Sequence, residues 1–302
     1  MEFYSNGKLL ISGEYFVLDG AKCLALPCKK GQLLKIKPNT FNENIIWESW
    51  DIKKNLWLSA EFDLLSLKIL KGDKNSVELI LLKKILIELK KLNPDCLKTP
   101  VIIITQLEFN LKWGLGSSST LINNLAKWSK TDPYKLLSLT FGGSGYDIAC
   151  ANSNSSILYR KINNSITFSN AKFFPNFHQN LFFIYLNKKQ NSKNEISRYL
   201  KLKKPLQEKI NKISYLSEQM TLVENQEEFN EIILEHEKII SDHIGLNPIK
   251  KEFFQDFNGE IKSLGAWGGD FILASSNNKE EVKNYFKNQR LNTIIPFSEL
   301  SI

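Results

Sequence analysis

The chain has 302 residues, of which 42% are apolar and 24% charged, so it can bury a sizeable core and lacks the composition of a disordered protein. Its formal net charge is +8. Most of its lysines lie singly or in pairs rather than in one dense basic stripe, which argues against nucleic acid as a partner. The length favours two medium-sized domains.

Targeting and metal-binding signals are weak in this sequence. The opening MEFYSNGKLLISG has no basic segment followed by an apolar run, and so does not read as a secretory signal. No stretch approaches the roughly 18 uncharged apolar residues needed to span a bilayer. The cysteines and histidines do not have metal-ligand spacing. We therefore expect a cytoplasmic protein that makes no membrane contact.

The first part of the chain, residues 1–70, predicts a meander of short strands in an antiparallel sheet. These strands are expected at 8–12, 15–18, 31–37, 45–50 and 56–60. From residue 77, apolar residues recur at three- and four-residue spacing, which predicts an amphipathic helix that ends at Asn93 and Pro94. A β-branched run at 101–104 then predicts a buried strand.

A loop at 110–116 separates that strand from two predicted helices, 117–128 and 133–140, and a second glycine-bearing turn follows at 142–145. A strand is expected near 157–160. A new unit begins with a strand at 181–186, and a capping box at Ser192 opens the next helix. Further helices are expected at 206–224, 228–243, after Pro248 and at 280–288, with strands at 261–264, 271–275 and 293–296.

The segment 112–119 reads KWGLGSSS and lies between an apolar strand and a helix. Glycines let a backbone approach a phosphate closely, and a helix N-terminus presents unpaired N–H groups with roughly half a positive charge. The segment is not a Walker loop, which needs GxxxxGK followed by Ser or Thr. It predicts a phosphate site, and a serine-capped helix after a glycine turn is the alternative.

Three further motifs accompany this loop, in a fixed order: GKLLISGEY at 7–15, GSGYDIA at 143–149 and GAWGGD at 265–270. Together the four motifs resemble those of the GHMP kinases, the superfamily of galactokinase, homoserine kinase, mevalonate kinase and phosphomevalonate kinase. The resemblance spans residues 7–275. The finer spelling, GKL with GEY, KWGLGSSS and KSLGAWGGD, is most similar to that of the phosphomevalonate kinases.

The resemblance implies an α+β fold of two domains, the GHMP kinase fold. The N-terminal domain, 1–170, would be like ribosomal protein S5 domain 2 and carry the phosphate loop, and the C-terminal domain, 171–302, would be ferredoxin-like. The implied activity is transfer of the γ-phosphoryl group of ATP, with Mg²⁺, to an anionic small molecule. Phosphomevalonate, in the mevalonate pathway of isoprenoid biosynthesis, is the implied acceptor.

The resemblance also implies roles for single residues. Lys8 would bridge acceptor and γ-phosphate as a point charge, and Asp147 would orient or deprotonate the nucleophilic oxygen; these two are the implied catalytic residues. ATP phosphates would be bound by Gly114, Leu115, Gly116, Ser117, Ser118 and Ser119, with Ser118 also a ligand of Mg²⁺. The acceptor would be bound by Glu14, Tyr15, Ser144, Gly145, Lys188, Lys189, Ser192, Gly268, Gly269 and Asp270.

Two positions depart from the family pattern. Trp267 stands where the family has a small glycine, and an indole there would narrow the nucleotide site or reshape the acceptor pocket. The segment 110–112 lacks the family's proline. The open alternatives are a mevalonate kinase, a diphosphomevalonate decarboxylase, and a catalytically silent ligand-binding protein on the same fold. The oligomeric state is open too, with a homodimer as one alternative.

Overall fold

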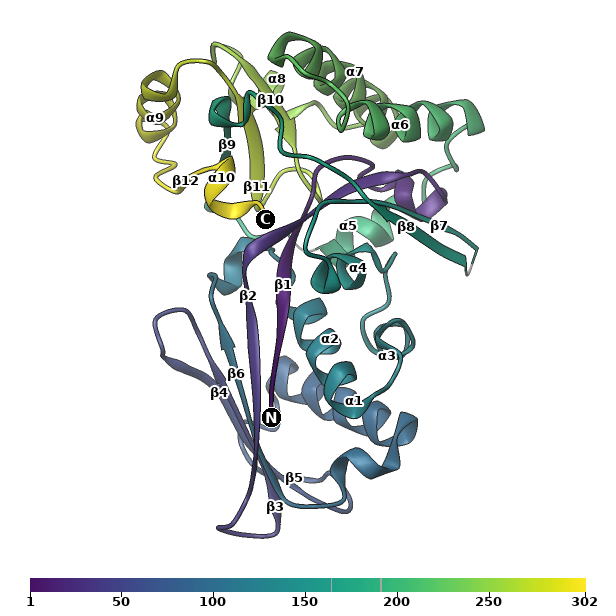
Figure 1. The fold of residues 1–302 in the computed structure, drawn as a ribbon, viewed down its shortest axis with the longest axis vertical. Helices are drawn as coiled ribbons and strands as arrows, with labels where there is room; N and C mark the ends of the chain where they lie inside the picture. Colours follow the sequence, from purple (N-terminus) through teal and green to yellow (C-terminus); the bar gives the residue numbers. More distant parts are fainter. Residues whose placement is uncertain (164, 191) are drawn as a thin grey trace. The chain divides into compact units, whose positions relative to one another are not determined.

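A computed structural model describes residues 1–163, 165–190 and 192–302, apart from the side chains of residues 192 and 193. The chain forms two compact units, and Figure 1 labels their elements. Unit 1 consists of Met1–Gly7, Lys30–Leu111 and Leu115–Asn152, and unit 2 of Lys8–Lys29, Lys112–Gly114 and Ser153–Ile302. Because the chain passes from one unit to the other several times, each unit is assembled from separate stretches. A single boundary at residue 170 stays a prediction.

The sheet of unit 1 is built around the long strand β2, which enters this unit at Lys30. The order across the sheet is β5 (Ile69–Lys71), β4 (Leu56–Asp63), β3 (Asn44–Trp50), β6 (Val101–Leu107) and β2 (Cys23–Pro38), with β1 (Glu2–Leu10) also paired to β2. The pairing of β3 with β6 is parallel, and the other pairs along this path are antiparallel. The strands expected at 31–37, 45–50 and 56–60 are present, but they do not form one antiparallel meander, because β6 lies between β2 and β3 and runs parallel to β3.

Helices α1 (Val77–Leu92), α2 (Ser117–Ser129), α3 (Pro133–Thr140) and α4 (Tyr146–Asn152) complete unit 1. The hydroxyl of Ser76 accepts a hydrogen bond from the N–H of Leu79 and so caps α1, which buries one apolar face. That face packs with Trp47 and Phe62 of the sheet in one core cluster. The predicted amphipathic helix is confirmed, and α2 packs against both α3 and α4.

Unit 2 contains a second, antiparallel sheet. Its order is β10 (Glu260–Ser263), β11 (Phe271–Ser275), β9 (Leu181–Tyr185) and β12 (Ile294–Pro296). Its helices are α5 (Ser192–Tyr199), α6 (Gln207–Gln219), α7 (Gln226–Ile244), α8 (Ile249–Phe253), α9 (Lys279–Asn288) and α10 (Phe297–Leu300). Every residue of β9 and β11 is buried, as expected for central strands. Strands β7 (Ile157–Ile162) and β8 (Ser165–Asn170) pair with each other, and β7 pairs with the Cys23 end of β2.

The strand predicted at 15–18 is wrong, because Phe16–Asp19 forms a 3₁₀ turn. Tyr15 has a φ of 60° and Gly20 a φ of 91°, so a residue with positive φ lies on either side of the turn. Such residues cannot continue a β-strand. The apolar side chains of Phe16 and Val17 are buried in this turn instead. Across the described residues, no helix is both long and apolar enough to cross a membrane.

Candidate active site

Residues from three of the four motifs meet in unit 2. The Lys8 ammonium, at the end of β1, donates a hydrogen bond to the carbonyl oxygen of Gly114 at 3.0 Å. Asp270 lies so close to Gly114 that a Cβ atom on this glycine would come within 2.2 Å of Asp270 Oδ2. Gly114 also has a φ of 65°, so both its conformation and its contacts require glycine. The structure thus places Lys8, Gly114 and Asp270 together.

The segment that follows β9 lies beside the last motif. The N–H of Asp270 donates to the carbonyl oxygen of Lys188 at 2.7 Å, and Asp270 Oδ1 accepts from the N–H of Gln190 at 3.2 Å. Gly269 packs closely against Gln190. Burial raises the pKa of Asp270 above its ordinary value, while the Gln190 N–H and the charges of Lys8 and Lys189 act in the opposite direction. The Asp270 carboxylate therefore lies near the positive charges of Lys8 and Lys189, which an anionic ligand could also contact.

Trp113 holds the start of the phosphate loop against the second sheet. Its ring meets Phe271 edge-on, with the ring centroids 5.6 Å apart, and it also packs against Tyr185 at 6.4 Å. Aromatic pairs in this distance range contribute to stability beyond the area they bury. Trp113 therefore anchors Gly114, a positioning role that its sequence context did not reveal.

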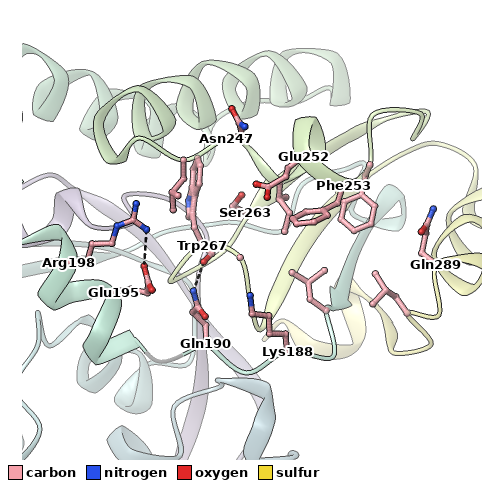
Figure 2. A pocket seen from close by; sticks show the side chains of 16 residues that line it. Lys188, Gln190, Glu195, Arg198, Asn247, Glu252, Phe253, Ser263, Trp267 and Gln289 are labelled. Atoms are coloured by element: carbon pink, nitrogen blue, oxygen red, sulfur yellow. Dashed lines mark hydrogen bonds and ion pairs between the residues drawn. The ribbon is translucent and has the colours of Figure 1, made fainter.

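A pocket of about 470 Å³ opens in unit 2 beside the segment that follows β9, and Figure 2 shows the residues that line it. Two predicted acceptor residues, Lys188 and Gly268, line it. The other polar lining groups, among them Gln190, Glu195, Arg198 and Glu252, were not predicted, because Gln190 lies in a loop and the others on helices, and none of them belongs to a motif. The pocket combines both signs of charge with an apolar wall, as small-molecule sites commonly do.

Glu14 does not line this pocket, because it is fully buried in a charged cluster of unit 2. The ammonium of Lys262 donates to Glu14 Oε1 at 2.7 Å and to Glu237 Oε1 at 3.5 Å. Ser263 donates from its hydroxyl to Glu237 Oε2 at 2.7 Å, and His236 Nε2 accepts from the N–H of Gly13 at 2.9 Å. We call this set, Glu14, His236, Glu237, Lys262 and Ser263, the buried cluster.

The buried cluster holds two carboxylates and one ammonium group, so its charges do not balance. Burial raises the pKa of Glu14 to about 7, partly offset by Lys262, and it also raises the pKa of Glu237. Burial lowers the pKa of His236 well below its ordinary value, so this ring is neutral and its Nε2 atom can accept from Gly13. The cluster ties the GEY motif to α7 and β10. The role predicted for Glu14 in acceptor binding stays a prediction.

Tyr15 also lies in a packed region. It is 7% exposed, and its ring stacks on Tyr199 with the centroids 5.2 Å apart. Tyr199 in turn donates from its hydroxyl to Asp19 Oδ2. The positive φ of Tyr15 is thus held by packing around its side chain. Ser192 begins α5, and its side chain lies outside the described part of the structure.

The phosphate loop enters α2 in unit 1 with its helix N-terminus open. Gly116, with a φ of 88°, is the N-cap residue, and it provides no side chain to bind the first N–H groups of the helix. Ser119 is buried and donates its hydroxyl to the carbonyl oxygen of Gly116 at 2.9 Å, whereas Ser118 is exposed. Leu115 is buried below the loop. The helix dipole and its leading amides are therefore available to an anion.

Asp147 lies in the first turn of α4, which packs against α2 in the same unit. Its Oδ1 atom accepts from the N–H of Ile148 at 3.2 Å. The preceding Ser144 and Gly145 are buried, and Gly145 has a φ of 89°, a conformation that favours glycine. Burial, together with the charge of Asp147, raises the pKa of Tyr134 to about 12. Asp147 belongs to unit 1 and Lys8 to unit 2, so their pairing stays a prediction.

The loop at 114–119 could bind Mg²⁺ only with a small number of protein ligands. Within the described part of the chain, no three His, Cys, Asp or Glu side chains gather as a metal site. Mg²⁺ in phosphotransferases is usually held by one or two protein oxygens, with phosphate oxygens and waters completing the shell. The exposed hydroxyl of Ser118, at an open helix N-terminus, fits such a ligand set.

Comparison with known proteins finds likeness only among solved structures, since no family model and no curated protein matches the sequence. The Methanococcus jannaschii mevalonate kinase is 16% identical with a TM-score of 0.68, covering 97% of this chain and 96% of that one. The Streptococcus pneumoniae phosphomevalonate kinase, in complex with phosphomevalonate and AMPPNP, is 16% identical with a TM-score of 0.63, covering 97% of each chain. The Lactococcus lactis galactokinase, complexed with galactose, is 13% identical with a TM-score of 0.65, covering 97% and 91%.

The fold is therefore that of the GHMP kinases, and the predicted α+β class is confirmed over nearly the whole chain. The mevalonate kinase, the phosphomevalonate kinase and the galactokinase resemble this fold to similar degrees. At this level of identity the likeness establishes the fold, and the chemistry has to be argued from the site.

Proposed function

We propose that this protein is an ATP-dependent kinase that transfers the γ-phosphoryl group to a small anionic acceptor. The observation that carries the proposal is the open N-terminus of α2 behind a glycine loop, with Ser118 exposed at its first turn. Backbone amides at such a terminus bind phosphate without any charged side chain. The GHMP kinase fold supports the same reading by analogy.

In this proposal the residues of the chain mainly position and neutralise charge, because phosphoryl transfer requires little covalent chemistry from the protein. ATP with Mg²⁺ supplies the phosphoryl group and neutralises its oxygens. Lys8 is assigned to the developing charge between acceptor and phosphate, and Asp147 to the acceptor hydroxyl as orienting group or base. Lys8 already donates to the backbone of the phosphate loop at Gly114, which supports its assignment.

We further propose that the acceptor carries a phosphate as well as a carboxylate, with phosphomevalonate as the specific candidate. The GEY motif at 13–15 and the GGD motif at 268–270 support this choice. The exposed Lys188 and Lys189, beside Asp270, are the cations assigned to the second anionic group. Lys262 is excluded from that role, because it is fully buried and bonded to Glu14 and Glu237.

Nucleotide binding to wild type and Gly116→Val tests the phosphate loop. A valine at a φ of 88° is strained, and it places a branched side chain where the phosphates should lie, so ATP binding measured by calorimetry should be lost. Gly245→Val is the matched control, since Gly245 ends α7 with a φ of 68° and has open space around its Cβ position. Unchanged ATP affinity in folded Gly116→Val would sink the assignment.

Acceptor turnover tests the finer proposal. The value of kcat/KM for phosphomevalonate should exceed that for mevalonate by about 10³, because an empty phosphate subsite leaves its donors unpaired. The double variant Lys188→Gln/Lys189→Gln should reduce phosphomevalonate turnover more than mevalonate turnover, while the exposed pair Lys203→Gln/Lys204→Gln serves as control. Equal use of mevalonate points to a mevalonate kinase, and release of CO₂ with ADP to a decarboxylase. Binding without any turnover points to a silent ligand-binding protein.

A further inference from the structure

Resting on the proposed function, we propose that Trp267 determines acceptor specificity: its indole bounds the pocket of unit 2, and its Nε1–H binds an oxygen of the acceptor. The acceptor class this requires is a short-chain organic anion that presents an oxygen to the indole and a compact aliphatic part to the apolar wall. Trp267 stands at the position where this chain departs from the family's small residue.

Trp267 lies in the segment between β10 and β11 and is only 3% exposed, yet it lines the pocket. In Figure 2 it stands between Glu195 and Arg198 of α5 on one side and Glu252 with Phe253 on the other. Its ring belongs to the same core cluster as Tyr15 and Tyr199, which holds it in place. A rigid indole at this point limits the size and shape of what the pocket accepts.

The backbone of Trp267 is fixed as well. Its carbonyl oxygen accepts a hydrogen bond from Gln190 Nε2 at 2.8 Å, and Gln190 also donates from its N–H to Asp270 Oδ1. Gln190 therefore links Trp267 to the cluster around Lys8 and Gly114. An acceptor held against the indole would lie beside groups assigned to phosphoryl transfer.

The indole nitrogen of Trp267 is buried and has no hydrogen-bond partner among the described residues. Buried indole N–H groups usually find one. Elsewhere in this chain, Trp47 donates to Ser49 at 2.8 Å and Trp50 donates to Glu48 at 3.2 Å. An unpaired buried donor is costly in the free protein, and a ligand oxygen that accepts from it removes that cost on binding. The donor thus favours a ligand with an acceptor atom at this point.

The rest of the lining defines the ligand. Ile249, Phe254 and Leu291 give an apolar wall, while Lys188 and Arg198 bring positive charge. A hydrocarbon part packs on that wall, and anionic oxygens suit the cations and the indole N–H. Glu195 and Glu252 line the same pocket, so its charge alone does not favour every anion. A branched acid of a few carbons has this combination of groups.

Two substitutions separate the two roles of the indole. Trp267→Phe keeps an aromatic ring but removes the N–H, and should weaken phosphomevalonate binding about tenfold or more, in both Kd by calorimetry and KM, with ATP affinity unchanged. Trp267→Gly restores the family's small residue, and should lower the preference for phosphomevalonate over galactose, whose sugar ring is broader than an open chain, by about tenfold. Trp57→Phe, on the partly exposed strand β4, is the control.

Tryptophan fluorescence provides a readout that needs no turnover. Titration with phosphomevalonate should change the emission of wild type and Trp57→Phe, and this change should be lost in Trp267→Phe. If wild type turns over its acceptor and Trp267→Phe matches it in Kd and KM, the inference is overturned while the proposed function stands. If wild type releases no ADP but shows the Trp267-dependent signal, the proposed function fails while the inference stands. The absence of both signal and turnover overturns both.

Discussion

The two glycine loops of this protein, 114–119 and 265–270, differ in what their side chains do. The first leads into α2 with its amides open and Ser118 exposed, so its chemistry is carried mainly by the backbone. The second carries the buried indole of Trp267 and ends at Asp270, whose carboxylate packs on Gly114. It follows Lys262, the centre of the buried cluster.

The difference suggests a division of labour. A site made of backbone amides recognises phosphate in general, because amides and a helix dipole do not distinguish one phosphate-bearing ligand from another. Side chains that are packed and unpaired, such as the Trp267 indole, discriminate between ligands, because each must be matched by a partner. We therefore assign phosphate binding to the first loop and the choice of acceptor to the second.

The largest effect is expected where the second loop is anchored. Lys262→Met leaves Glu14 and Glu237 buried without their cation, and should lower the free energy of unfolding by about 3–5 kcal/mol. Chemical denaturation measures this change. Lys250→Met, which removes a half-buried partner of Glu260, should cost less than about 1.5 kcal/mol. If both variants are equally stable, the buried cluster does not anchor the loop.

Lys8→Ala and Asp147→Asn test the reacting groups on the phosphate side. Each should reduce kcat by about 10² or more, because an electrostatic or acid–base contribution is lost. Their Tm values should stay close to that of wild type. Steady-state kinetics with thermal unfolding on the same samples separates the two effects. Near wild-type turnover in both variants would contradict the assignment.

Glu14→Gln tests the proton held in the buried cluster. The folded-state pKa of Glu14 is raised to about 7 from 4.5, so the stability it contributes is present in acid and is lost as pH rises through this window. Relative to Glu14→Gln, wild type should therefore lose up to about 3 kcal/mol between pH 5 and pH 8. His236 has a lowered pKa and acts with the opposite sign, Glu237 has a raised pKa and acts with the same sign, and both are present in the two proteins. A stability difference that stays constant with pH would argue against this proton.

The smallest effects should distinguish neighbouring serines of the first loop. Ser119→Ala removes the hydrogen bond to the Gly116 carbonyl and should cost about 1 kcal/mol of stability. Ser118→Ala removes an exposed hydroxyl, so its stability should change by less than about 0.5 kcal/mol while the Mg²⁺ concentration needed for activity rises. Titration of activity against Mg²⁺ checks the second effect. The reverse pattern would assign the metal to Ser119.

Local patterns predicted much of the fold, because they report local physics. The spacing of apolar residues predicted α1, and the glycine and serine run predicted the start of α2. The strand predicted at 15–18 was wrong because its apolar residues suit a buried turn equally well, and nothing in the sequence indicates the positive φ of Tyr15. Propensity alone does not decide such cases.

Long-range contacts explain what was missed in the site. Glu14 and Lys262 are 248 residues apart, and each carries a charge that normally indicates an exposed position. Arg198 lines the pocket from α5 and Gln190 from the loop before it, and neither residue belongs to a recognisable motif. Trp267 was noticed as a departure from the family pattern, but its unpaired N–H becomes visible only when its surroundings are known.

A coupled assay of ADP release with mevalonate, phosphomevalonate, homoserine and galactose tests the central claim most directly. We predict Mg²⁺-dependent ADP release that is strongest with phosphomevalonate, lost in Lys8→Ala, and retained in the Lys203→Gln/Lys204→Gln control. Absence of ADP release with all four acceptors, from folded protein that still binds ATP, would contradict the claim that this chain is a kinase for such acceptors.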